Sequence, residues 1–161
     1  MTNVLFVSKE NAARSLLAEA CLSHLGKGRF RAFSCGRPSA ISDAPSPWAI
    51  LALNNAGISS EGLRCKSWTE FTRSGTPMMD FVISLDEGSW DAQPIWLGQP
   101  ETALWAYPPL KAKRKEPAQL GIKTLHTLHS LRQRVELLVN LHSKLTKRSE
   151  LSHDLRDLAF L

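Results

Sequence analysis

The chain has 161 residues, of which 43% are hydrophobic and 22% charged, a composition typical of one globular domain and not of a disordered or fibrous protein. No apolar run approaches the roughly 18 residues that a membrane span needs, and the N-terminus lacks the basic and apolar segments of an export signal. Cys21, Cys35 and Cys65 have neither metal-binding nor redox-pair spacing, and the net charge is a mildly basic +5. We therefore expect a protein of the reducing cytoplasm with no membrane association.

The first predicted elements enclose a loop that is suited to bind an anion. Residues 4–7 form a continuous apolar run that predicts a buried strand over residues 3–7, and a helix is expected over residues 15–25. A loop between a strand and a helix N-terminus directs backbone N–H groups and the positive end of the helix dipole at one point. We predict an oxyanion site there, formed by Ser8, Lys9, Glu10, Asn11, Ala12, Ala13, Arg14 and Ser15.

Individual side chains of this loop have specific expected roles. Arg14 can clamp two oxygens of a tetrahedral oxyanion with its planar guanidinium group. Asn11 is suited to brace the loop from inside, and Ser15 offers a hydroxyl group next to Ser8. A Glu10 carboxylate that faced the site would repel phosphate, and the sequence does not give its direction. One alternative stays open, in which the loop keeps its shape only because it joins the strand to the helix.

Strand and helix signals alternate along the rest of the chain, which predicts a parallel sheet. Further strands are expected over residues 29–34, 80–85 and 101–106, and residues 88–100 are expected to form a long ordered loop because they are rich in glycine, proline and tryptophan. The predicted fold is a doubly wound α/β domain with a four-stranded parallel sheet and helices on both faces.

Two shorter helices are indicated between the second and third strands. Ser46 is a plausible N-cap with Pro47 at the first helical position, and Gly57 ends that helix. Ser67 and Glu70 form a capping-box pattern, which predicts a short helix that begins after Ser67.

The C-terminal part of the chain predicts an amphipathic helix over about residues 124–145. Its apolar positions recur every three or four residues, at Leu125, Leu128, Leu131, Val135, Leu138 and Leu141. We expect residues 1–146 to form the domain and residues 147–161 a helical C-terminal extension. Leu151, Leu155 and Leu158 of this extension can pack back on the domain, dock a protein partner, or belong to a frayed end.

The loop motif resembles the signature of a known family. Ser8-x5-Arg14-Ser15 followed by Ala18-Glu19-Ala20 is similar to the Cys-x5-Arg-Ser…Ala-Glu-Ala motif of the low-molecular-weight protein tyrosine phosphatases and, more narrowly, of their arsenate-reductase-like branch. Further similar segments extend this resemblance over about residues 3–146, at 33–38, 47–58, 67–71, 80–84, 94–105 and 131–137. The resemblance implies a phosphotyrosine protein phosphatase I-like fold and a phosphatase or arsenate reductase activity.

The catalytic residues that this resemblance implies are replaced by other residues in this chain. The nucleophilic cysteine position is Ser8, the general-acid aspartate position is Pro108, and the two relay cysteines of thioredoxin-coupled arsenate reductases fall at about Asp86 and Gln93. A serine needs an adjacent base to act as a nucleophile, and Glu10 is the nearby candidate. We therefore expect a catalytically inactive pseudophosphatase that binds phosphate, sulfate, arsenate or a phosphorylated ligand, with a regulatory or interaction role.

The competing hypothesis is an active phosphatase or arsenate reductase whose cysteine at position 8 was changed to serine in the laboratory. The residues at Pro108, Asp86 and Gln93 favour a native serine, because an engineered substrate trap needs one change. A protein-interaction module with a vestigial pocket is a third possibility, which would show no saturable oxyanion binding.

No cofactor and no metal ion are expected. His126 and His129 lie one helical turn apart without a third ligand pattern. Nucleic acid is not favoured as a partner, because aromatic residues are not interleaved with the two basic clusters, which are Lys111, Lys113, Arg114 and Lys115, and Lys144, Lys147 and Arg148. These charges are expected to be solvated or to steer an anionic ligand toward the loop.

Overall fold

The computed structural model describes residues 1–111, 117–144 and 148–161. Its centre is a four-stranded sheet with the strand order β2-β1-β3-β4, in which every pairing is parallel. The strands are β1 (Thr2–Val7), β2 (Phe30–Cys35), β3 (Phe81–Ser84) and β4 (Glu101–Leu104). The predicted α/β fold with a four-stranded parallel sheet is therefore confirmed, and each predicted strand lies within two residues of its observed ends.

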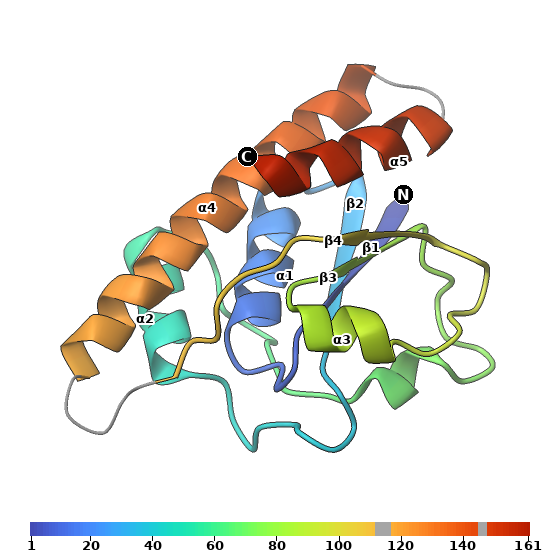
Figure 1. The fold of residues 1–161 in the computed structure, drawn as a ribbon. Helices are drawn as coiled ribbons and strands as arrows, with labels where there is room; N and C mark the ends of the chain where they lie inside the picture. The colour runs from blue at the N-terminus through green and yellow to red at the C-terminus, as the bar shows by residue number, and fades with distance from the viewer. Residues whose placement is uncertain (112–116, 145–147) are drawn as a thin grey trace.

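The helices follow the strands in the alternating order that the sequence predicts. They are α1 (Arg14–Leu25), α2 (Pro47–Asn55), the 3-10 helix η1 (Trp68–Phe71), α3 (Glu87–Ala92), α4 (Pro117–Lys144), α5 (Arg148–Asp157) and the 3-10 helix η2 (Leu158–Phe160). Figure 1 shows α4 and α5 on the same side of the sheet, with α1 between α4 and the strands. In the segments described, no helix combines the length and the apolar character that crossing a membrane requires.

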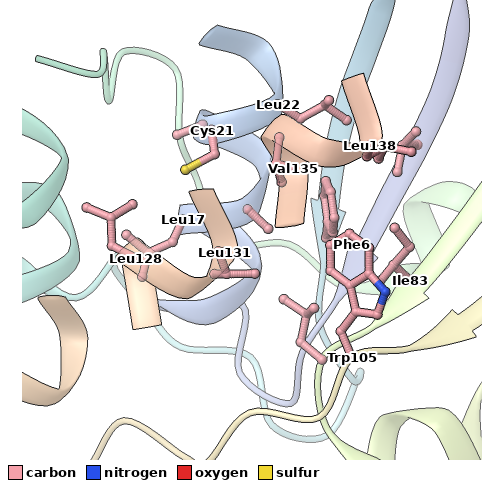
Figure 2. Close-up of a cluster of buried hydrophobic side chains, with 14 of the residues drawn as sticks. Phe6, Leu17, Cys21, Leu22, Ile83, Trp105, Leu128, Leu131, Val135 and Leu138 are labelled. Atoms are coloured by element: carbon pink, nitrogen blue, oxygen red, sulfur yellow. The ribbon is translucent and has the colours of Figure 1, made fainter. Parts of the chain in front are cut away.

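The larger core lies on the face of the sheet that α1 and α4 cover. Successive residues of β1 point to opposite faces, and Val4 and Phe6 point into this core, where they are completely buried. Figure 2 shows the labelled side chains of α1 and α4 meeting Phe6, Ile83 and Trp105. These contacts fix the N-terminal end of α1 against the sheet, which positions the loop between β1 and α1.

The opposite face of the sheet has a smaller core. Leu5 and Val7 of β1 pack there with Val82 of β3, under a layer that includes Phe71 of η1 and Trp96. Ser67 caps η1 by accepting a hydrogen bond from the Thr69 N–H group. The predicted capping box is therefore half right, because Glu70 takes two hydrogen bonds from Arg64 instead of reaching back to Ser67.

The predicted loop over residues 88–100 is wrong at its start, where the chain forms α3. Asp86 is the N-cap of this helix, and its Oδ1 atom accepts a hydrogen bond of 2.8 Å from the Ser89 N–H group. Asp86 followed by Ser89 is a good signal for a helix N-terminus. The loop was predicted instead because Gly88 and Pro94 are residues typical of loops. A capped helix therefore follows β3 directly.

The C-terminal helix also differs from its prediction. It begins at Pro117 instead of residue 124, and Gly121 lies against the Trp48 ring. Leu125 was expected on the buried face but is 43% exposed, whereas Thr124 and Leu128 are buried. The buried stripe therefore runs through Thr124, Leu128, Leu131, Val135 and Leu138, with spacings of four and three residues.

The C-terminal tail packs on the domain. Leu151, Leu155 and Leu158 are buried in the larger core, and the Trp105 Nε1 atom donates a hydrogen bond of 2.9 Å to the Leu155 carbonyl oxygen. These three leucines are thus not free to dock a partner. The expected domain boundary between residues 146 and 147 and the basic residues Lys113, Arg114, Lys115 and Lys147 lie outside the described residues.

Candidate functional site

A cavity of about 550 Å³ lies at the carboxyl ends of β1 and β3. These two strands are neighbours, and the chain leaves them in opposite directions across the sheet, because β2 lies beyond β1 and β4 beyond β3. Such a switch in strand order opens a crevice outside the carboxyl ends of the strands, where α/β proteins bind ligands. The cavity is lined by Ser8, Lys9, Glu10, Ala12, Ala13, Arg14, Ser46, Asp86, Glu87, Ala106, Tyr107, Pro108, Pro109, Leu110 and Lys111.

Several carbonyl groups of the loop over residues 8–13 have hydrogen-bond partners, whereas several of its N–H groups have none. The carbonyl oxygens of Lys9, Glu10 and Ala12 accept hydrogen bonds from the N–H groups of Arg37, Ser42 and Ser46, outside the loop. Among the described residues, no acceptor engages the N–H groups of residues 10, 12 and 13. These three donors are therefore free for an external acceptor, at the N-terminus of α1, where the helix dipole favours an anion.

Ser8 lies at the bottom of the loop and is 2% exposed. Its Oγ atom is 2.6 Å from Ser15 Oγ, and the Ser15 N–H group donates a longer hydrogen bond of 3.4 Å to it. No carboxylate, imidazole or amine of the described residues is hydrogen-bonded to the Ser8 hydroxyl. The predicted neighbourhood of Ser8 and Ser15 is correct, and it contains no base that would make this hydroxyl a nucleophile.

Asn11 braces the loop from inside, as we predicted from the sequence. Its φ angle of 52° is in the left-handed region, which non-glycine residues rarely occupy. The side-chain amide donates hydrogen bonds to Ser15 Oγ and Ser34 Oγ, and its oxygen accepts one of 2.9 Å from the Lys66 N–H group. These three buried hydrogen bonds hold the turn that orients the loop.

We expect Asn11→Ala to lower the free energy of unfolding by about 2–4 kcal/mol. The substitution leaves the buried Lys66 N–H group without an acceptor, which costs roughly 1–3 kcal/mol, and it adds backbone strain of about 1 kcal/mol at the positive φ angle. Urea unfolding of Asn11→Ala and Asn11→Gly separates the two effects. Glycine accepts the φ angle, so Asn11→Gly is expected to be the more stable variant, and the reverse order would contradict this account of the turn.

Arg14 extends over the loop and is 8% exposed. Its Nη1 atom donates a hydrogen bond of 3.0 Å to the Tyr107 carbonyl oxygen, and its Nη2 atom is 3.8 Å from Asp86 Oδ2. Burial lowers the pKa of the guanidinium group, and the nearby carboxylates of Asp86 and Glu10 act against this shift. An arginine keeps its charge under these conditions, so Arg14 is a fixed cation beside the free N–H groups.

The structure shows the direction of the Glu10 side chain, which the sequence did not give. Its Oε1 atom forms an ion pair of 2.8 Å with Lys111 Nζ, so its charge is compensated at the mouth. Pro108, at the position expected for a general acid, lines the cavity, but a proline carries no ionisable group. Tyr107 is hydrogen-bonded to Ser130 Oγ, and burial raises the pKa of its phenol.

Asp86 is the site residue that the sequence reasoning missed, because that reasoning treated the position only as a replaced cysteine. Its Oδ2 atom accepts a hydrogen bond of 2.9 Å from the Lys9 N–H group. The signal that could have found it was its place directly after a buried strand, at the carboxyl edge shared with Ser8. Gln93, in contrast, lies outside the cavity lining and bonds with Trp90 and Trp96.

None of the three cysteines lines this cavity. Cys21 and Cys35 are buried, and burial raises the pKa of Cys21 to about 12 and that of Cys35 further still. Cys65 is half-buried, and burial raises its pKa as well.

Within the described residues, no group of three or more histidine, cysteine or acidic side chains could hold a metal ion. The two histidines considered as metal ligands, His126 and His129, are exposed on α4.

Comparison with known proteins gives consistent results. The family described as low molecular weight phosphotyrosine protein phosphatase matches residues 3–149. A glutaredoxin arsenate reductase from Synechocystis sp. is 28% identical over 140 residues, which are 86% of this chain and 97% of that protein.

Two solved structures show the same fold. A structure described as an arsenate reductase in the phosphate binding state has a TM-score of 0.69 and 27% identity, and the match covers 87% of this chain and 98% of that chain. An arsenate reductase from Archaeoglobus fulgidus, at 20% identity, has a TM-score of 0.65 with 85% and 98% covered, and it supports the fold alone.

Proposed function

Because the chain belongs to the low-molecular-weight phosphotyrosine protein phosphatase family, we propose that it binds a tetrahedral oxyanion in the loop of residues 8–15 and does not turn it over. The observation that supports binding most directly is the set of free N–H groups at residues 10, 12 and 13 beside the buried guanidinium of Arg14. Phosphate, arsenate, sulfate and phosphorylated ligands all have the shape and charge that such donors accept.

The absence of turnover follows from the groups around the bound oxyanion. The Ser8 hydroxyl contacts another hydroxyl and no base, and its pKa lies far above that of a thiol. Nucleophilic attack on phosphorus therefore lacks an activated oxygen. Pro108 cannot protonate a leaving group, and the loss of a general acid alone lowers a rate by about 10²–10⁴-fold. The site can hold and orient a phosphorylated ligand without cleaving it.

A regulatory or interaction role fits a domain that binds without reacting, with a phosphorylated ligand as partner. The cavity leaves room for more than the phosphoryl group, and Tyr107, Pro109 and Leu110 give it apolar walls. A protein partner at the C-terminal tail would have to use the exposed side of α5, since the three leucines of the tail face the core.

A second candidate function, phosphatase or arsenate reductase activity with a cysteine at position 8, is favoured by the similarity to an arsenate reductase at 28% identity. The Ser8→Cys variant tests it. The loop donors and Arg14 would hold a cysteine as thiolate, but the position of the acid would still be a proline. Phenoxide is a poor leaving group that needs a proton, so we expect Ser8→Cys to hydrolyse phenyl phosphate no faster than the Ser8→Cys, Arg14→Gln control.

The ester assay, an arsenate-reduction assay and calorimetry together separate the candidate functions. Equal, background-level rates for both variants support the binding protein. Strong turnover by Ser8→Cys that the second substitution abolishes would favour the enzyme, and reduction of arsenate by Ser8→Cys with glutathione would favour the reductase. If calorimetry with inorganic phosphate shows no saturable binding to the unaltered protein, the pocket is vestigial and the proposal fails.

A further inference from the structure

The carboxylate of Asp86 is fixed at the edge of the oxyanion loop. Its Oδ1 atom accepts a hydrogen bond from the Ser89 N–H group, and its Oδ2 atom accepts one of 3.0 Å from the Ser89 hydroxyl. The same Oδ2 atom accepts from the Lys9 N–H group and is 3.8 Å from Arg14 Nη2. Since α3 and the loop both hold it, Asp86 cannot turn away from a bound ligand without losing its cap of α3 and its bond to Lys9.

An oxyanion that accepts a hydrogen bond from Arg14 Nη2 has an oxygen near this carboxylate, because Arg14 Nη2 and Asp86 Oδ2 are 3.8 Å apart. A carboxylate accepts hydrogen bonds and donates none. An oxygen that carries a proton can donate to Asp86 and form a charge-assisted hydrogen bond. An oxygen without a proton brings its lone pairs and negative charge against those of the carboxylate, which is repulsive.

The other charges of the cavity do not change this conclusion. Lys111 compensates Glu10 at the rim, and Glu87 is an exposed residue of α3. Asp86 is thus the carboxylate that contacts both a loop N–H group and Arg14. Arg37 also approaches this region, where its guanidinium group lies against Gly88 of α3, and Lys9 contributes a cationic side chain to the lining.

We propose that Asp86 makes the site selective for tetrahedral oxyanions that carry a proton. Hydrogen phosphate and hydrogen arsenate belong to this class near neutral pH, whereas sulfate has lost its protons. A phosphate monoester is mostly a dianion without a proton above its second pKa of about 6. This proposal rests on the proposed function, and it orders the ligands of the site: the free hydrogen oxyanions first, then ester dianions and sulfate.

The test compares inorganic phosphate with sulfate by isothermal titration calorimetry at pH 7.5 and constant ionic strength. The unaltered protein is expected to bind phosphate about 10- to 100-fold more tightly than sulfate, which corresponds to one charge-assisted hydrogen bond. Asp86→Asn keeps a good N-cap and the size of the side chain. It is expected to bring the two affinities within about threefold of each other, mainly because sulfate binding improves.

Glu87→Gln is the matched control, because it removes the same charge from the cavity lining and from the same helix. Glu87→Gln is expected to raise the affinities for phosphate and for sulfate by a similar small factor, so the preference for phosphate is kept. Phenyl phosphate at pH 7.5 extends the test to a monoester dianion, which is expected to gain affinity in Asp86→Asn as sulfate does. Thermal unfolding of each variant checks that α3 is intact.

The outcomes separate this proposal from the proposed function. Equal binding of phosphate and sulfate by the unaltered protein would overturn the selectivity and leave oxyanion binding standing. Loss of the preference in Glu87→Gln as well would also overturn it, since net charge would then explain the effect. Binding of both anions only after Asp86→Asn would show that Asp86 plugs the site. Binding of neither anion by any of these proteins would refute the proposed function and the selectivity together.

Discussion

Arg14→Gln is expected to weaken the binding of inorganic phosphate by at least about 100-fold. The guanidinium group can give two charge-assisted hydrogen bonds to one oxyanion, each worth roughly 1.5–3 kcal/mol. Arg14 is also buried, so the substitution removes a fixed positive charge from beside Asp86, where the bound oxyanion needs it. Calorimetric titration with phosphate measures the change.

Two further variants make this result specific. Arg14→Lys keeps the charge and loses the planar fork, so we expect a loss of about tenfold instead of 100-fold. Arg73→Gln removes the same charge from an exposed position outside the cavity lining and is expected to bind phosphate normally. A weakening of less than threefold in Arg14→Gln would contradict the assignment of Arg14 as the oxyanion clamp.

Trp105→Ala is expected to lower the free energy of unfolding by about 3–5 kcal/mol, the usual cost of removing a large buried ring. Trp105 is completely buried just beyond β4, and its ring centre is 6.2 Å from that of Phe6. The guanidinium carbon of Arg134 lies 5.9 Å from the same ring, and Nε1 bonds to the Leu155 carbonyl oxygen. One side chain thus joins the sheet, α4 and the tail.

Urea unfolding followed by circular dichroism measures this loss of stability. Trp105→Phe keeps an aromatic ring and removes the hydrogen bond to the tail, so its cost is expected to be smaller, about 1–2 kcal/mol. If Trp105→Ala costs less than 1 kcal/mol, the tail and the sheet do not share the packed core that the structure describes.

Much of the fold could be predicted because its signals are local. A continuous apolar run predicts a buried strand such as β1, and Pro47 with Gly57 marks both ends of α2, where Gly57 has a φ angle of 71°. Leu125 shows the limit of this approach. The buried stripe of α4 runs through Thr124 instead of the neighbouring Leu125, so this leucine is exposed. Which of the two is buried depends on how the start of α4 packs against α2 and the Trp48 ring.

The candidate site could be predicted where its residues are contiguous. The loop from Ser8 to Ser15, the bracing role of Asn11 and the place of Arg14 beside the cavity all follow from one strand–loop–helix segment. Asp86 and the ion pair between Glu10 and Lys111 could not be predicted in this way, because they join segments that are distant in the sequence. Their contacts depend on the pairing of β1 with β3 and on the course of the chain after β4.

The central claim, binding without cleavage, is tested most directly by ³¹P nuclear magnetic resonance on the unaltered protein mixed with one equivalent of phenyl phosphate at pH 6. We expect the ester resonance to shift and broaden on addition of protein, and to return when excess inorganic phosphate displaces the ester. The inorganic phosphate resonance is expected not to grow before that addition. Growth of inorganic phosphate at a rate that depends on protein concentration, or an ester resonance unaffected by the protein, would contradict the account.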